Sequence, residues 1–212
     1  PITFFGEFPG RESVPFESRP TRSMVQHSEC SEGADYDPCV DSTGRWLVFS
    51  STRHSPKPDL YIKAVQGAAI TQVTSDPAAD IQPAYSPDNQ RLAFASDRRG
   101  NYDIWVVGVD GQNTMQLTDS PAPEVHPTWS PNGQFIAYCS MNRQSKQWEI
   151  WMLDVKQPGT KKFIGQGLYP HWSSKGDILV YQKARERGSY LFSVWTIQLV
   201  TGEPRYPTEV TS

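Results

Sequence analysis

Short apolar runs separated by polar turns recur along most of this chain. In one unit the runs are HPTWS, QFIAYCS, WEIWMLD and KKFIG, which cover residues 126–130, 134–140, 148–154 and 161–165. They are rich in β-branched and aromatic side chains and are bounded by Pro, Gly, Asn and Asp. These features predict four short β-strands, and no part of the unit shows a sustained helical period.

The same unit occurs four times. The stretches that open the units cover residues 37–51, 82–96, 126–140 and 169–183, and each contains an aligned proline. Successive prolines lie 45, 44 and 43 residues apart at Pro38, Pro83, Pro127 and Pro170. A nearly constant period of this size is typical of a repeat architecture.

The middle runs of the units are apolar on both faces, as in residues 92–94 and 104–107. A solvated antiparallel sheet would alternate apolar and polar residues, whereas a sheet packed between two other sheets needs both faces apolar. Together with the period, this pattern predicts an all-β protein, a β-propeller of four-stranded antiparallel blades. The turns at 87–89, 131–133 and 174–176 need a positive φ near their ends.

These motifs resemble the TolB-like β-propeller repeat, also called PD40 and related to the WD40 repeat. The resemblance covers about residues 35 to 208 and is carried by Pro-x-Trp-Ser-Pro-Asp-Gly, Ile-Ala-Phe-x-Ser-x-Arg, Asp-Ile-Trp and a closing Leu-Thr. The second unit matches best, while Asp41 and Lys183 replace the expected serines in the first and fourth units. The resemblance implies an extracytoplasmic protein, periplasmic or envelope-associated in a bacterium, that grips peptide segments of other proteins.

The repeats divide the chain into an N-terminal extension, residues 1–22, and a propeller segment, residues 23–212. Within the segment the blades are expected at about 35–74, 80–118, 124–165 and 167–208. A six- to eight-bladed ring needs more repeats than these four, so the chain is expected to be part of a larger ring. A closed ring of four blades is the alternative. The chain starts with Pro1 rather than Met, which indicates a processed or excised segment.

The composition of the chain and the absence of several motifs exclude some classes of function. The formal net charge is −3, so the chain has no basic surplus for nucleic acid. No apolar stretch approaches the roughly 20 residues that span a bilayer. Nucleophile elbows, metalloprotease motifs, phosphate-binding glycine loops and Cys-x-x-Cys pairs are all missing from the sequence. We therefore expect a protein that is not an enzyme and needs no cofactor, with calcium as the one candidate ion.

Three acidic residues are aligned three residues before the blade prolines: Asp35, Asp80 and Glu124. They open the innermost strands, which converge on the axis of a propeller. Carboxylates at one level would raise one another's pKa values unless a cation lies between them. Ca²⁺ is one candidate, since it takes oxygen ligands, and a Lys or Arg of a partner is another. Alternatively, each acid caps its own loop by accepting backbone hydrogen bonds.

Other polar residues fall into two groups. His126 and His171 lie on innermost strands without metal-ligand spacing, which favours a structural or channel-facing role and makes them candidates for an axial binding site. Arginines recur after the second strand and acids open the third, which predicts one ion pair per blade. The expected pairs join Arg53 to Asp59, Arg98 to Asp103 and Arg143 to Glu149.

The three cysteines have different expected roles. Cys30 and Cys39 flank a short loop and could form a disulfide in an oxidising compartment, or they could be independent thiols. Cys139 aligns with Ser50 and Ala95 and is expected to be a small core residue.

Two functions remain from different classes. The first is a scaffold that binds other proteins, such as envelope proteins or subunits of a complex, through its loop faces or axial channel. The second is the gating propeller of a serine peptidase of the prolyl oligopeptidase kind, whose catalytic domain would lie outside this chain. Nothing in the residues nominates a catalytic nucleophile, which favours the first.

Overall fold

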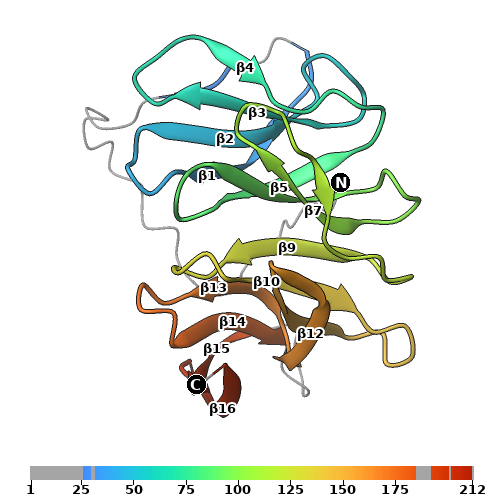
Figure 1. Ribbon diagram of the computed structural model, residues 1–212, viewed down its shortest axis with the longest axis vertical. Coiled ribbons are helices and arrows are strands. Elements are labelled where there is room, and N and C mark those ends of the chain that lie inside the picture. Colours follow the sequence, from blue (N-terminus) through green and yellow to red (C-terminus); the bar gives the residue numbers. More distant parts are fainter. Residues whose placement is uncertain (1–25, 30–31, 185–191, 201, 212) are drawn as a thin grey trace, which may run out of the picture.

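The computed structural model describes residues 26–29, 32–184, 192–200 and 202–211 of the 212-residue chain. These residues form sixteen β-strands and no helix, which confirms the all-β prediction. The strands pair into four antiparallel sheets that follow one another along the molecule, from β1–β4 at the top of Figure 1 to β13–β16 at the bottom. A helix able to cross a membrane does not occur in this part of the chain.

Each sheet is a meander of four strands that are consecutive in the sequence. The first sheet contains β1 (Asp35–Val40), β2 (Trp46–Ser51), β3 (Asp59–Ala64) and β4 (Ile70–Gln72). The second contains β5 (Asp80–Tyr85), β6 (Arg91–Ser96), β7 (Asp103–Gly108) and β8 (Met115–Gln116). The third contains β9 (Glu124–Trp129), β10 (Phe135–Met141), β11 (Trp148–Asp154) and β12 (Gln157–Gln166). The fourth contains β13 (Leu168–Trp172), β14 (Ile178–Ala184), β15 (Phe192–Val200) and β16 (Glu203–Glu209). The expected N-terminal extension, residues 1–22, lies outside the described residues.

The turn between the first two strands of a blade has the backbone that its sequence predicts. The last turn residue has a positive φ in all four blades, at Gly44 (69°), Asn89 (58°), Gly133 (69°) and Gly176 (74°). Glycine and asparagine adopt this conformation most readily, which is why these residue types end the turns.

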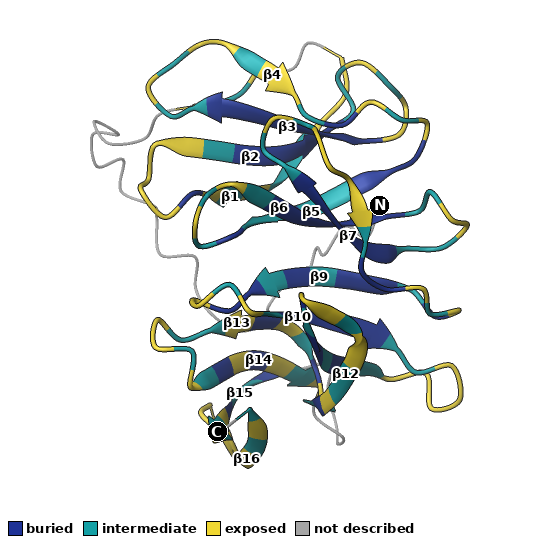
Figure 2. Ribbon diagram, viewed as in Figure 1, coloured by how far each residue is buried: buried dark blue, intermediate teal, exposed yellow. Residues whose placement is uncertain are grey.

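The hydrophobic core has three main layers, one between each pair of adjacent sheets, and a smaller fourth cluster around Ala95, Val125 and Cys139. The first layer joins Val48, Leu60 and Ile62 to Leu92, Phe94, Trp105 and Val107. The second joins Ala93, Ile104 and Val106 to Trp129, Ile136, Tyr138 and Leu153. The third joins Ala137, Ile150 and Met152 to Leu179, Tyr181 and Ile197. The middle strands of the first three sheets are therefore buried on both faces (Figure 2), as predicted, and each large buried side chain contributes about 1.5–3 kcal/mol relative to exposure.

The first strands of the four sheets lie side by side at the centre of the assembly. Strand β5 contacts both β1 and β9, and β9 contacts β13. Among the described residues β1 and β13 make no comparable contact, so the four blades form an open arc rather than a closed four-bladed ring. The four-bladed ring that the sequence left open is therefore not the observed arrangement, and the larger ring stays a prediction.

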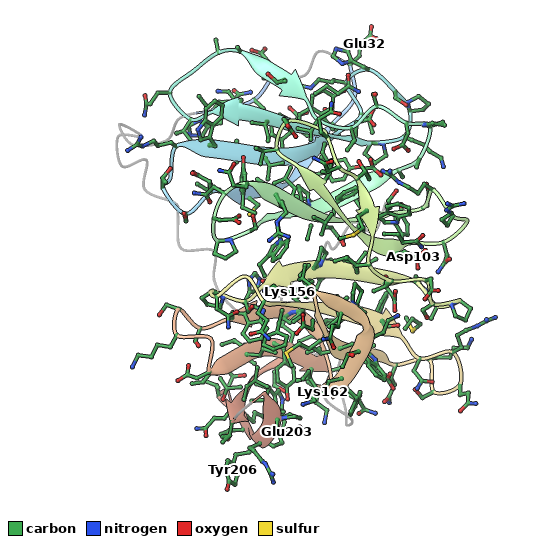
Figure 3. The ribbon with its side chains drawn as sticks, in the orientation of Figure 1. Glu32, Asp103, Lys156, Lys162, Glu203 and Tyr206 are labelled. Carbon is green, nitrogen blue, oxygen red and sulfur yellow. The ribbon has the colours of Figure 1, made fainter. Side chains whose placement is uncertain are left out.

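The outer face of the fourth sheet departs from the repeat. Positions that hold the fully buried Ala93 and Ala95 in the second blade hold Val180, which is 37% exposed, and the exposed Gln182 in the fourth. Strand β16 is exposed along most of its length (Figure 2). It is tied to the third blade by an ion pair between Lys162 Nζ and Glu203 Oε1, 2.6 Å apart (Figure 3).

Candidate functional site

The four innermost strands share an unusual backbone conformation directly before their aligned prolines. The residue at that position is left-handed in every blade: Asp37 (φ 52°), Gln82 (57°), His126 (56°) and Tyr169 (55°). Strand pairing shifts its register at the same place in all four sheets. Proline has no N–H to give to the ladder, so the ladder is interrupted there and the strand forms a β-bulge.

This conformation is strained. A positive φ is uncommon in residues other than glycine, and each instance costs of the order of 1–3 kcal/mol. Since the strain recurs in all four blades, the packing of the inner strands must maintain it. Strained residues cluster at functional sites, so the side chains at these four positions are the first candidates for a binding site.

The four strained residues lie together on one cavity of about 520 Å³, which we call the inner groove. All four innermost strands contribute to its walls. The described residues that line the groove include one carboxylate, at Asp37, and two imidazoles, but no lysine or arginine. Its lining residues are Asp37, Pro38, Cys39, Val40, Ser42, Gln82, Pro83, Ala84, Tyr85, Ser86, Pro87, His126, Pro127, Thr128, Trp129, Tyr169, Pro170 and His171.

His126 is held in the groove from both sides. Its backbone N–H donates to Gln82 Oε1 at 2.9 Å, and its ring Nε2 lies 3.3 Å from Gln82 Nε2. The Tyr169 ring packs against it with the centroids 4.3 Å apart. Burial and, to a smaller extent, the nearby His171 together lower the pKa of His126 to about 4, so His126 is neutral near pH 7.

Asp35 and Asp80 lie outside the inner groove, and each is paired with a cation of its own blade. Arg53 Nη2 donates to both oxygens of Asp35 at 2.9 Å. Arg98 Nη2 donates to the oxygens of Asp80 at 3.0 and 2.9 Å and also contacts Asp76 at 2.8 Å. Each arginine follows its acid by 18 residues and reaches back across the first hairpin.

Glu124 has a weaker partner. The residue 18 positions after it is Asn142, and Arg143 is displaced by one place. Glu124 Oε1 instead faces Lys161 Nζ at 3.7 Å, and its buried Oε2 has no hydrogen-bond partner within the described ranges. Burial raises the pKa of Glu124, although Thr118 and Lys161 oppose the shift and Asp103 reinforces it.

The three acids do not share one cation. In the part of the chain that the structure describes, no three His, Cys, Asp or Glu side chains are grouped closely enough to hold a metal ion. The residues present therefore do not fit a common calcium ion at Asp35, Asp80 and Glu124. Loop capping does not account for Asp35 and Asp80 either, because their main partners are the side chains of Arg53 and Arg98.

The expected arginine partners were wrong for Arg53 and Arg98, which bind the acid on the inner strand. Asp59 accepts instead from Gln72 Nε2 at 3.1 Å, and Asp103 accepts from Gln116 Nε2 at 3.1 Å. Both acids face the next blade, where they approach Asp80 and Glu124 respectively. After β2 and β6 the backbone stays bonded beside the start of the inner strand, where Thr52 N donates to Ala34 O and Asp97 N to Ala79 O, and this places the arginines next to the acids of that strand.

The structure describes the positions of all the remaining predicted residues except Cys30. His171 lines the inner groove beside His126, so the structure brings these two predicted site residues together and separates them from the three acids. Cys139 is fully buried, which confirms its expected core role. Cys39 lines the groove, whereas Cys30 lies outside the described residues, so the disulfide between them stays a prediction.

Asp37, Gln82 and Tyr169 are functional candidates that were not predicted from the sequence. A signal for them existed, because the residue before each aligned proline changes its chemistry while the proline itself is constant. The positive φ that turns these side chains toward the groove could not be read from the sequence, since a residue before proline ordinarily prefers an extended backbone.

Comparisons with known proteins agree with this geometry. The profile of the family described as TolB beta propeller domain (PD40) matches residues 21–196. TolB of Agrobacterium tumefaciens superposes with a TM-score of 0.71 at 19% identity, over 87% of this chain and 69% of that one. TolB of Acinetobacter baumannii gives 0.65 at 19% identity, over 83% and 46%. A puromycin-hydrolyzing peptidase of Mycobacterium tuberculosis gives 0.60 at 15% identity, over 87% and 29%.

No curated protein sequence matches the chain at a significant level. At these identities the solved structures share the fold alone, and this chain spans less than half of the second and third. The profile, in contrast, covers most of the chain, including the four strained residues, the prolines that follow them and the arginines paired with the acids of the inner strands. Four such blades in sequence, matched by that profile, place the chain in the TolB β-propeller domain family.

Proposed function

We propose that this chain is a non-enzymatic binding module of an extracytoplasmic, envelope-associated protein, and that it holds peptide segments of other proteins in the inner groove. One observation carries the proposal. The four blades repeat the same strained backbone before the aligned proline but present a different side chain each time: Asp37, Gln82, His126 and Tyr169. A constant backbone with varied side chains suits the recognition of a ligand whose chemical groups differ along its length, such as a peptide.

The groove is suited to side-chain recognition rather than to strand addition. Innermost strands are sheet edges, and an exposed edge can pair with a further strand. Here the aligned proline removes an N–H from each edge, and the bulge bends the strand beside it. A peptide is therefore held by contacts with the groove's side chains. The volume of about 520 Å³ lies within the roughly 300–1,000 Å³ of ordinary ligand sites.

Hydrogen bonding in the groove favours binding over hydrolysis. The serine hydroxyls of the groove form hydrogen bonds with groups other than the imidazoles. Ser86 Oγ is hydrogen-bonded to Asp88 and to the Arg91 carbonyl. Ser42 Oγ accepts from Asn89 Nδ2 at 2.8 Å. A nucleophilic serine would need the imidazole as its base within hydrogen-bond reach.

A gating propeller of a serine peptidase is the second candidate. It is supported by the superposition on a puromycin-hydrolyzing peptidase, which extends well beyond the region matched by this chain. In that case the inner groove would contact substrates on their way to a separate catalytic domain. The peptide-binding proposal applies to both cases, and they differ in whether the bound peptide is later cleaved.

The test compares two tyrosines with the same local backbone. Tyr169 and Tyr206 each precede a proline, and their own φ angles are nearly equal, at 55° and 54°. Tyr206, however, lies on β16 and does not line the groove. The chain is immobilised and used to select binders from a displayed library of random heptapeptides. We expect Tyr169→Ala to abolish binding of the selected peptides and Tyr206→Ala to leave it unchanged.

Two results would contradict the proposal. The first is the absence of any selected peptide, and the second is equal loss of binding in both variants. Melting temperatures of the two variants are measured alongside, so that unfolding is distinguished from loss of the binding site.

A further inference from the structure

We infer that the inner groove selects a basic peptide segment, with a Lys or Arg side chain against Asp37 and a hydrogen-bond acceptor of the peptide against Nδ1–H of His126. This inference rests on the proposed peptide binding and names the class of ligand that the groove takes. Two independent features carry it: an acid without a cation, and an imidazole fixed in one tautomer.

Asp37 has no cationic partner among the described residues. It takes part in no ion pair there, although it is the one carboxylate among the described residues that line the groove. Arg53 of the same blade is committed to Asp35 through two hydrogen bonds and lies over the rings of Phe49 and Tyr61. Burial raises the pKa of Asp37, while a hydrogen bond from the Gln82 backbone N–H opposes the shift.

The groove therefore favours a cation from outside. Since the described residues that line it include no lysine or arginine, an incoming ammonium or guanidinium meets no cationic side chain among them. The rings of Pro38, Pro83 and Pro127 also line the groove and suit the methylene stem of a Lys or Arg side chain. A neutral or acidic segment would leave the carboxylate with its hydrogen bond from the Gln82 backbone N–H but without a cation, and so would bind less tightly.

The hydrogen bonds around His126 determine its tautomer. A backbone N–H can only donate, so the bond from His126 N identifies the accepting atom of Gln82 as the amide oxygen. The other amide atom of Gln82 is then the NH₂ group, which donates to Nε2 of the imidazole. A neutral imidazole whose Nε2 accepts carries its proton on Nδ1.

The proton on Nδ1 is available to a ligand. No described residue accepts a hydrogen bond from Nδ1, and His126 lines the groove. The Tyr169 ring packs against the imidazole at an interplanar angle of 58° and limits its rotation. A carbonyl or carboxylate oxygen of a bound peptide fits this donor, whereas a donor group would not. Gln82 acts here as a positioning residue, through His126.

The first experiment uses heptapeptides selected on the wild-type chain. We expect enrichment of Lys and Arg among them, and about tenfold weaker binding of a selected peptide to Asp37→Asn, measured by calorimetry. Replacing the basic residue of the peptide with norleucine is expected to weaken binding by a similar factor, with no further loss in Asp37→Asn. Asp110→Asn, in an exposed turn outside the groove, is the matched control.

The outcomes separate the inference from the function on which it rests. If selected peptides need Tyr169 but show no preference for basic residues, the inference fails and peptide binding stands. If the norleucine and Asp37→Asn effects simply add, the cation does not contact Asp37 and the inference fails as well. If no peptide is selected, both fail.

The second experiment examines the imidazole in the free chain. Nitrogen-15 NMR at pH 7 is expected to show His126 protonated at Nδ1, and Gln82→Leu is expected to mix the two tautomers. A spectrum of the wild-type chain with the proton on Nε2 would overturn the assignment of the donor.

Discussion

Replacing Arg98 with alanine tests how the blades neutralise their buried acids. Asp80 is fully buried, and Arg98 Nη2 is bonded to both of its oxygens at 3.0 and 2.9 Å. The guanidinium also lies 4.6 Å from the centre of the Trp105 ring. Burial raises the pKa of Asp80 even with Ser96 and Arg98 beside it, so the carboxylate depends on this cation.

The expected loss of stability is large. Removing one partner of a buried ion pair leaves an uncompensated charge and costs about 3–5 kcal/mol. For a chain of this size each kcal/mol lowers the melting temperature by about 2–4 °C, so Arg98→Ala is expected to lower it by roughly 6–20 °C. The change is measured by thermal unfolding followed by circular dichroism at pH 7, and the free energy by urea denaturation.

Two comparisons identify the cause. Arg53→Ala removes the equivalent arginine of the first blade, but the Asp35 side chain keeps 11% exposure to water, so this variant is expected to lose less. Asp80→Asn in the Arg98→Ala background removes the buried charge and is expected to recover part of the loss. The reasoning is refuted if Arg98→Ala costs no more than Arg53→Ala, or if Asp80→Asn recovers nothing.

Two further predictions concern pH and backbone. Burial, with Asp119, raises the pKa of Asp103 to about 6, so folded-state stability falls as pH rises from about 4 to 6. Asp103→Asn is therefore expected to raise the free energy of unfolding by about 1 kcal/mol at pH 7 and not at pH 3.5, and an equal gain in urea denaturation at both pH values would contradict this. Gly111 and Gly202 have φ of 80° and 77°, but only at Gly111 would a Cβ meet a neighbour, the Val73 carbonyl oxygen at 2.7 Å. Gly111→Ala is expected to lower the melting temperature clearly more than Gly202→Ala, and equal effects would show that the contact is unimportant.

Local sequence was sufficient for the blades. Strand positions, turn residues such as Gly133 and the burial of both faces in residues 92–94 follow from the order of apolar, polar and turn-forming residues over a few positions. A period near 44 residues then implies stacked copies, since one such sheet cannot bury both of its faces alone. These features depend on short-range geometry that each repeat specifies by itself.

The choice of ion-pair partners needed three dimensions. Arg53 has acids on both sides, at Asp35 on the inner strand and Asp59 on the third strand, and the sequence spacing favoured the nearer one. In the structure Arg53 pairs with Asp35, because the loop after β2 runs beside the inner strand β1. The direction of a loop is set by the packing of neighbouring blades, which local spacing does not describe.

The order of residues is enough to predict the repeat, the four-stranded blades and the inner prolines. The packed blades are needed to show that Asp37, Gln82, His126 and Tyr169 face one groove and that Asp35, Asp80 and Glu124 do not. The physical reason is the β-bulge before each proline, which reverses the sign of φ and so changes the direction of a side chain within two residues of the acids. Residues about 44 positions apart then meet because the blades converge at their inner strands, which contact one another.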